Sequence, residues 1–190
     1  MTAKPQFALF DTALGACGVA WNDVGLVGVQ LPDADPADLR ARFVRRLPGA
    51  AEAEPDPKTA QAISAIRRLL AGEPRDLIDV ALDPCGQSEI MMRIYRITRA
   101  IPPGRTRTYG DVAAEAATDA RAVGQAMGRN PWPIVVPCHR VMGAGGKLTG
   151  FSAPGGTDTK LKMLAIEHAR LSDAPGLFDD LGGLPIGVRG

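Results

Sequence analysis

Cysteine and histidine are scarce in this sequence of 190 residues, which contains three cysteines and two histidines. Cys17, Cys85 and Cys138 are widely spaced and odd in number, so they indicate a reducing compartment rather than a disulfide framework. The sequence has no CxxC pair, and the adjacent Cys138 and His139 cannot easily reach one metal ion. We therefore expect no metal site and no other cofactor.

Long apolar runs and a strong net charge are also missing. No stretch is long enough to span a bilayer, and the amino terminus lacks the pattern of a signal peptide, so we expect a cytoplasmic protein without membrane contact. The net charge is +1, but residues 1–86 hold nine basic and twelve acidic residues, whereas residues 87–171 hold twelve and six. A basic half is a weak sign of a polyanionic partner, although many solvated surfaces share it.

The first half of the chain predicts a small antiparallel sheet and two helices. Short β-rich runs alternate with glycines, and Asn22-Asp23 fits a hairpin turn between two of them. The predicted strands cover residues 7–10, 18–21, 25–31 and 77–82, and the helices cover residues 38–47 and 59–71. We place a domain boundary near residue 86, after Asp83-Pro84 breaks the pattern.

The second half is predicted to be mostly helical. Ser88 is suited to cap a helix that runs to about Ala100 and carries its arginines on the outer side. Two short helices follow, one ending near Thr118 and one covering residues 120–129. Helices joined in this way are candidates for a helix-turn-helix, although many such pairs are purely structural.

The helix over residues 120–129 has one polar and one apolar face. At about 100° per residue, Arg121, Gln125 and Arg129 share one side, while Val123 and Met127 lie on the other. Small residues keep the helix thin enough to approach a phosphate groove; they are Ala122, Gly124, Ala126 and Gly128. Because each glycine lowers helix stability by about 1 kcal/mol, the two glycines predict close packing.

The segment from Pro131 to Val141 places Cys138 between prolines and a histidine. Proline fixes its own φ and pushes the preceding residue towards extended geometry, so we expect a rigid strand that presents the thiol at a corner. A free cysteine is otherwise a small buried hydrophobic residue. Asn130 lies on the inward side of its helix, where its amide is better suited to orient a neighbour than to face solvent.

A last helix is predicted over residues 157–171 and places Glu167 and His168 beside apolar residues. Burying a carboxylate without a partner is costly, so Glu167 is expected to reach the imidazole of His139 unless it lies at the surface. This pairing would complete a series of thiol, base and orienting group.

These residues resemble a known family. The matching positions are Arg121 to Gly124, Asn130-Pro131, Pro137-Cys138-His139-Arg140-Val141, Gly150, Ser152, Lys160 and Glu167. They are similar to the motifs of the O6-alkylguanine-DNA alkyltransferases, also called methylated-DNA–protein-cysteine methyltransferases. The resemblance implies an α+β fold: a small ribonuclease-H-like α/β domain in residues 1–86, a mostly helical, winged-helix-like domain with a helix-turn-helix in residues 87–171, and a tail in residues 172–190.

The resemblance implies a monomeric DNA repair enzyme that acts on double-stranded DNA containing O6-alkylguanine. The damaged base is flipped out of the duplex, and its alkyl group passes to Cys138. His139 accepts the thiol proton through a water, and Glu167 holds the imidazole ring. Asn130 orders the strand, and Tyr109 hydrogen-bonds the departing guanine. The thioether product cannot be hydrolysed, so each molecule acts once.

The same resemblance assigns the DNA contacts and the pocket. Gln125 and Arg129 enter the minor groove beside the small residues Ala122 and Gly124, and Arg121 fills the gap left by the flipped base. The implied pocket residues are Met127, Pro133, Val141, Phe151, Ser152 and Lys160.

The chain departs from the family pattern near the pocket. Phe151 stands where a tyrosine is common, and Ala153-Pro154 lengthens the following loop, so a different tolerance of alkyl size is expected. The turn between Tyr109 and Arg121 is about two residues shorter than is usual in the family.

Two other functions stay open. A lesion sensor keeps the fold but loses the cysteine, so Cys138 argues against it. A Cys-His thiol hydrolase needs a base far from the cysteine in sequence, and His168 is the only candidate.

Overall fold

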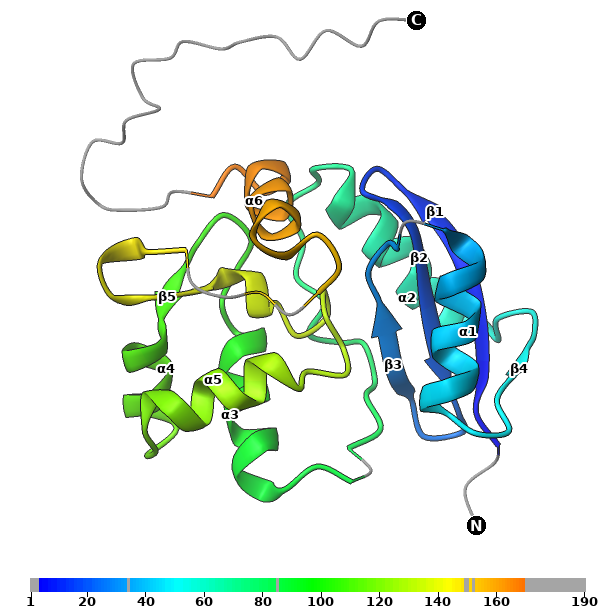
Figure 1. Ribbon diagram of the computed structural model, residues 1–190, viewed down its shortest axis with the longest axis horizontal. Helices are drawn as coiled ribbons and strands as arrows, with labels where there is room; N and C mark the ends of the chain where they lie inside the picture. The colour runs from blue at the N-terminus through cyan, green and yellow to red at the C-terminus, as the bar shows by residue number, and fades with distance from the viewer. Residues whose placement is uncertain (1–3, 34, 85, 149–150, 152, 170–190) are drawn as a thin grey trace, which may run out of the picture.

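A computed structural model of the protein describes residues 4–33, 35–84, 86–148, 151 and 153–169. A sheet with two helices forms one side of this α+β fold, and the remaining helices gather on the other side (Figure 1). The predicted tail and Ser152 lie outside the described residues. In the described part, no helix is both long enough and apolar enough to cross a membrane.

The sheet has four strands in the order β3-β2-β1-β4. β1 (Gln6–Thr12), β2 (Gly15–Trp21) and β3 (Leu26–Gln30) are antiparallel neighbours, as the alternation of β-rich runs and glycines predicts. Asn22 closes the β2–β3 turn, where its backbone N–H donates to the Gly25 carbonyl at 3.0 Å. The short β4 (Ala51–Glu52) pairs in parallel with β1.

The two amino-terminal helices cover opposite faces of this sheet. Successive side chains of a strand point to opposite sides, so Phe7 and Phe10 of β1 pack against different helices. Phe7 of β1 stacks on Phe43 of α1 (Pro36–Arg46), with ring centroids 5.1 Å apart. Phe10 belongs to the larger core cluster, together with Ile63 and Ile66 of α2 (Pro57–Leu70). Both helices begin with a proline after an aspartate N-cap, which fixes their starting points.

The strand predicted over residues 77–82 is wrong. Only an isolated bridge joins Leu82 to Leu26, and the segment otherwise turns. The Nη2 atom of Arg99 donates to three carbonyls of this segment, those of Leu77, Ile78 and Val80, at 2.6, 2.9 and 2.9 Å. These three carbonyls therefore bind a side chain and not a neighbouring strand. Arg99 was expected on the outer side of its helix and instead reaches back over this turn.

The helical side begins with α3 (Glu89–Arg99), whose N-cap Ser88 accepts from the Met91 amide as predicted. α4 (Tyr109–Glu115) and α5 (Ala120–Gly128) follow, four residues apart, and form the predicted helix pair. β5 (Arg107–Thr108) pairs in parallel with β6 (Val141–Met142). Two 3-10 turns, η1 (Cys138–Arg140) and η2 (Ala144–Gly146), precede α6 (Gly156–Ile166).

A continuous core joins the two sides, since one buried cluster contains Val19 and Leu69 as well as Tyr95 and Val136. The outer edge of β3 also docks on the segment before Cys138, where the Val29 amide donates to the Pro131 carbonyl at 2.8 Å. The division into two domains near residue 86 stays a prediction.

Candidate active site

The segment before Cys138 is a turn and not the expected strand. The Val136 amide donates to the Trp132 carbonyl at 2.7 Å, and Ile134 has a φ of 75°. A left-handed conformation is costly for a β-branched residue, by about 1–3 kcal/mol, so it must be held by its surroundings. Trp132 provides one anchor: it is buried, lies edge-on to Tyr95 and donates from Nε1 to the Leu26 carbonyl at 2.7 Å.

Asn130 closes the turn from the end of α5. Its Nδ2 donates to the Val136 carbonyl at 2.8 Å, and its Oδ1 accepts from the Trp132 amide at 3.0 Å. The Asn130 amide also opposes the rise in the pKa that burial causes at the Cys138 thiol. The inward amide thus orders the turn that leads to the thiol.

Cys138 opens the 3-10 turn η1 and is 7% exposed. Burial raises the pKa of its thiol, while the Asn130 amide and the Lys160 charge lower it. Lys160 of α6 is fully buried and donates from Nζ to the Val141 carbonyl at 2.7 Å. The resting thiol is therefore protonated, and both groups that would stabilise a thiolate already lie beside it.

His139 is paired with Glu167, as the sequence predicts. Its Nε2 lies 2.9 Å from Glu167 Oε1, and the two side chains are 0% and 3% exposed. Burial lowers the pKa of His139, so the imidazole is neutral near pH 7. Burial alone would raise the pKa of Glu167, but hydrogen bonds and charges from His139 and Arg140 outweigh it and lower this pKa to about 2.

The pairing fixes the tautomer of His139. An ionised carboxylate only accepts hydrogen bonds, so Nε2 carries the proton and Nδ1 keeps a free lone pair. Nδ1 is buried and has no hydrogen-bond partner among the residues that the structure describes. The site therefore contains a neutral base with an unused acceptor atom next in sequence to a thiol.

Arg140 is a residue of the site whose role was not predicted from the sequence, although it belongs to the Pro137-to-Val141 motif. Its Nε and Nη2 donate to the two oxygens of Glu167 at 2.9 and 2.7 Å, and its Nη1 donates to the Ile101 carbonyl at 2.5 Å. A buried carboxylate beside a neutral imidazole needs a cation. This requirement for a cation could have indicated Arg140 from the sequence.

Glu167 lies at the end of α6, which stops at Ile166 and not at the predicted Leu171. His168 takes a left-handed conformation with a φ of 52°, and the Ala169 amide donates to the Leu164 carbonyl at 2.9 Å. This pattern ends a helix. The expected face shared by Glu167 and His168 is therefore wrong: the Glu167 side chain is buried, whereas His168 is exposed.

A cavity of about 530 Å³ opens beside the thiol. Met127, Pro133 and Phe151 line it together with Asn130 and Cys138. A second wall comes from the sheet and from α1; its residues are Val29, Gln30, Leu31, Arg42, Arg45 and Arg46. Among the other predicted pocket residues, Val141 and Lys160 are buried and do not line this cavity.

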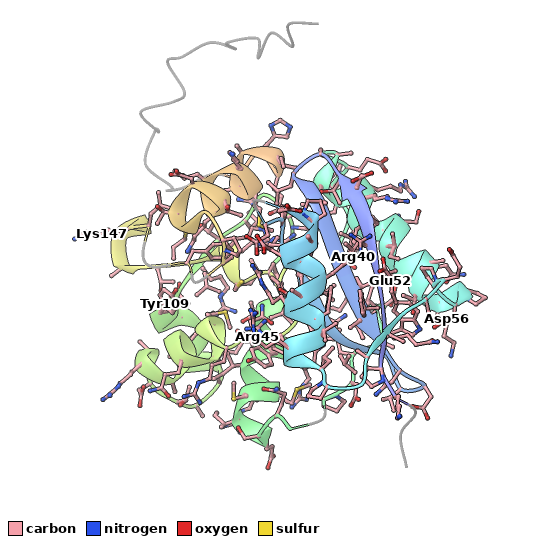
Figure 2. The ribbon with its side chains drawn as sticks, turned by 45° about the vertical axis from the view of Figure 1, so that its right-hand side comes forward. Arg40, Arg45, Glu52, Asp56, Tyr109 and Lys147 are labelled. Atoms are coloured by element: carbon pink, nitrogen blue, oxygen red, sulfur yellow. The ribbon has the colours of Figure 1, made fainter. Side chains whose placement is uncertain are left out.

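Tyr109 starts α4, where it is half-buried and does not line this cavity. Figure 2 labels it on the same side of the molecule as Lys147. The structure thus brings four of the five expected catalytic residues together and leaves Tyr109 at the start of its helix.

The two faces of α5 lie as the sequence predicts. Arg121, Gln125 and Arg129 are exposed, whereas Val123 and Met127 are buried. The inference of close packing at the glycines is wrong, because a Cβ added at Gly124 or Gly128 would meet no atom within 4 Å. The small residues leave open space along the exposed side of this helix, with Ala122 and Gly124 half-buried.

Comparisons with known proteins agree with this geometry. Residues 89–169 match the family model of the 6-O-methylguanine DNA methyltransferase DNA-binding domain. The chain is 46% identical to the methylated-DNA–protein-cysteine methyltransferase of Mycolicibacterium paratuberculosis over 177 residues, 92% of this chain and 99% of that protein. It is 38% identical to a DNA base-flipping protein of Thermus thermophilus over 130 residues, 66% of this chain and 87% of that one.

The fold is similar to that of Mycobacterium tuberculosis OGT in complex with DNA. The TM-score is 0.69 at 30% sequence identity, and the match covers 86% of this chain and 92% of the other. The mixed α+β class predicted from the sequence is confirmed.

Proposed function

This chain belongs to the methylated-DNA–protein-cysteine methyltransferase family, and we propose that Cys138 is the cysteine that receives the alkyl group. The protein is a DNA repair enzyme of the alkyl-transfer type. One observation carries the choice of residue: Cys138 lines the cavity together with Asn130, and the next residue in the chain is a neutral imidazole. Cys17, in contrast, is fully buried in β2, where burial raises its pKa to about 11.

The substrate is double-stranded DNA that contains O6-alkylguanine. The thiol proton passes through a water to the free Nδ1 atom of His139, and the thiolate attacks the alkyl carbon. A sulfur–carbon bond forms as the bond between that carbon and O6 breaks, and the electron pair stays on the guanine. The guanine takes a proton from the Tyr109 hydroxyl, the resulting tyrosinate regains a proton from solvent, and the imidazolium releases its own proton to solvent.

The groups around the thiol stabilise the charge that forms. Lys160 and the Asn130 amide favour the thiolate, and Glu167 stabilises the imidazolium through Nε2. The product is a thioether, which no group of this site can hydrolyse. The enzyme is therefore consumed in one reaction and needs no cofactor.

The exposed face of α5 enters the minor groove and supports the flipped state. Gln125 and Arg129 contact the backbone, Ala122 and Gly124 allow close approach, and Arg121 takes the place of the flipped base. Open space at Gly124 supports this placement. The protein acts as a monomer, since one α5 helix and one cavity suffice.

Mass spectrometry of the intact protein and of its peptides tests the acceptor. After incubation with duplex DNA containing O6-methylguanine, one methyl group is expected on Cys138, and the reaction stops at one equivalent. The Cys138→Ser variant should gain none, whereas the matched Cys17→Ser variant should react fully. A methyl group on another residue, or repeated turnover, contradicts the assignment.

A further inference from the structure

The cavity beside Cys138 has a basic wall that belongs to the amino-terminal half of the chain. Arg45 and Arg46 lie three and four residues after Arg42 on α1, so they share a helix face with it, and all three line the cavity. Figure 2 shows Arg45 projecting from α1 towards the helical side of the molecule, whereas Arg40 projects towards Glu52. The end of α1 thus faces the reactive site from the opposite side to α5.

The charge of this wall is only partly neutralised. Arg42 is held by an ion pair with Asp33 and by a 3.1 Å hydrogen bond to Gln30. Arg45 and Arg46 are exposed, and within the described residues neither takes part in an ion pair. Burial lowers the pKa of Arg42, and the charges of Arg46 and Arg45 lower it further, so the three guanidinium groups repel one another.

Two other arginines of this acidic half are neutralised by a carboxylate where they lie. Arg40 pairs with Glu52 at 3.0 Å, and Arg68 pairs with Glu73 at 2.6 Å. Within α1, the two arginines without an ion pair to a described residue, Arg45 and Arg46, are thus both at the cavity. An anionic group is the ligand that such a pair of exposed guanidinium groups would bind.

The position of the cavity indicates which anion this is. Met127 and Gly128, at the end of α5, line the same cavity as Arg45 and Arg46. A nucleotide that enters the cavity from a duplex on α5 stays covalently attached to its strand. The phosphates on either side of it must therefore remain near the mouth, between the end of α5 and the end of α1.

We propose that Arg45 and Arg46 bind the backbone phosphates beside the flipped nucleotide, so that α1 forms a second DNA-contacting surface. This inference rests on the proposed function, because it requires a nucleotide in the cavity. Contacts of this kind fix the position of the strand and carry no sequence information. Both side chains are exposed, which suits the strand outside the cavity better than a substituent of the base inside it.

A pair of double variants with equal changes in net charge tests the proposal. Arg45→Gln/Arg46→Gln removes the two arginines at the cavity, and Arg40→Gln/Arg68→Gln removes two paired arginines elsewhere in the same half. Binding is measured with duplex DNA containing O6-methylguanine, in a Cys138→Ser background that prevents transfer. Salt is varied from 50 to 200 mM.

Each phosphate contact contributes about 0.9 to the slope of log K against log salt. We expect the slope of the Arg45→Gln/Arg46→Gln variant to be shallower by about 2, so that its affinity falls about tenfold less than that of the parent over this salt range. The Arg40→Gln/Arg68→Gln variant should keep the parent slope. Equal slopes in the two variants would overturn the proposal.

Free bases separate a phosphate contact from recognition of the alkyl substituent. With Cys138 restored, transfer from free O6-methylguanine and free O6-carboxymethylguanine is expected to be unchanged by Arg45→Gln/Arg46→Gln. A selective loss with the carboxymethyl base and an unchanged salt slope would show that the arginines bind a carboxylate, and the proposal would be wrong. The two failures are distinguishable: methylation of a residue other than Cys138 contradicts the acceptor assignment, whereas equal salt slopes in the two double variants contradict the phosphate contact.

Discussion

The Nε2 atom of His139 lies 2.9 Å from Oε1 of Glu167, and both side chains are buried. Arg140 binds the same carboxylate through two nitrogens, so the carboxylate stays ionised although it is out of water. The ionised carboxylate in turn keeps the proton of His139 on Nε2 and leaves Nδ1 as the basic atom. The reactivity proposed for Cys138 therefore depends on a contact between residues 28 positions apart.

Replacing this carboxylate should change the stability of the protein in a pH-dependent way. The pKa of Glu167 falls from 4.5 to about 2 in the folded state, which corresponds to about 3 kcal/mol of stability near neutral pH. A lowered pKa contributes above the unfolded value and is lost as the pH falls through the folded one. Urea denaturation should show Glu167→Gln less stable by about this amount at pH 7, with the gap narrowing between about pH 4.5 and pH 2.

His139 also contributes to the pH dependence. Because its pKa is lowered, its burial reduces stability as the pH falls below 6.5, in the parent and in the Glu167→Gln variant alike. The control for loss of a carboxylate is Glu73→Gln, since Glu73 pairs with Arg68 at the surface and is 49% exposed. A constant gap between Glu167→Gln and the parent from pH 7 to pH 2 would contradict the ionised pair.

The rate of alkyl transfer should be nearly independent of pH between about 6 and 8. A neutral His139 takes the thiol proton inside the site, so no proton is exchanged with solvent before the attack. An imidazole with the ordinary pKa of about 6.5 would be about three-quarters protonated at pH 6, and the rate would fall accordingly. Single-turnover rates with a free O6-alkylguanine base measure this; a tenfold rise per pH unit would show that the thiol instead loses its proton to solvent.

Arg121→Ala should impair repair in duplex DNA far more than transfer from a free base. Arg121 is exposed on α5 and does not line the cavity, so its proposed task concerns the duplex and not the thiol. Arg96→Ala, on the exposed side of α3, is the matched control. Equal losses with the duplex and the free base would refute the role of Arg121 in filling the space of the flipped base.

Gly124→Ala should stabilise the protein and weaken its binding to DNA. Alanine is better than glycine inside a helix by about 1 kcal/mol, and beyond the neighbouring backbone of α5 the added methyl group meets no atom within 4 Å. The same methyl group would lie where the duplex is proposed to approach α5. Thermal unfolding and duplex affinity measure the two effects; a stabilised variant with unchanged affinity would place the groove elsewhere.

Local patterns were sufficient where a residue's environment follows from its neighbours in the chain. The two faces of α5 follow from helical spacing, and the start of α3 follows from the cap at Ser88. The pairing of Glu167 with His139 could be expected because a buried carboxylate needs a partner.

Tertiary contacts overrode local preference elsewhere. The prolines around Cys138 predict an extended segment, but the buried indole of Trp132 and the two hydrogen bonds of Asn130 hold a turn with Ile134 at positive φ. Residues 77–82 have the composition of a strand, yet Arg99 binds their carbonyls. No local rule reveals such contacts, because the partners are distant in sequence.

The sequence by itself predicted the chemistry of this protein, since the Pro137-to-Val141 motif, with its thiol followed by a histidine, resembles that of the alkyltransferase family to which the chain belongs. It also determined the polar face of α5, because helical geometry is local. Only the tertiary structure decided the binding of Arg140 to Glu167 and the approach of α1 to the cavity. Both depend on how distant segments pack on a shared core, and packing is a property of the whole chain.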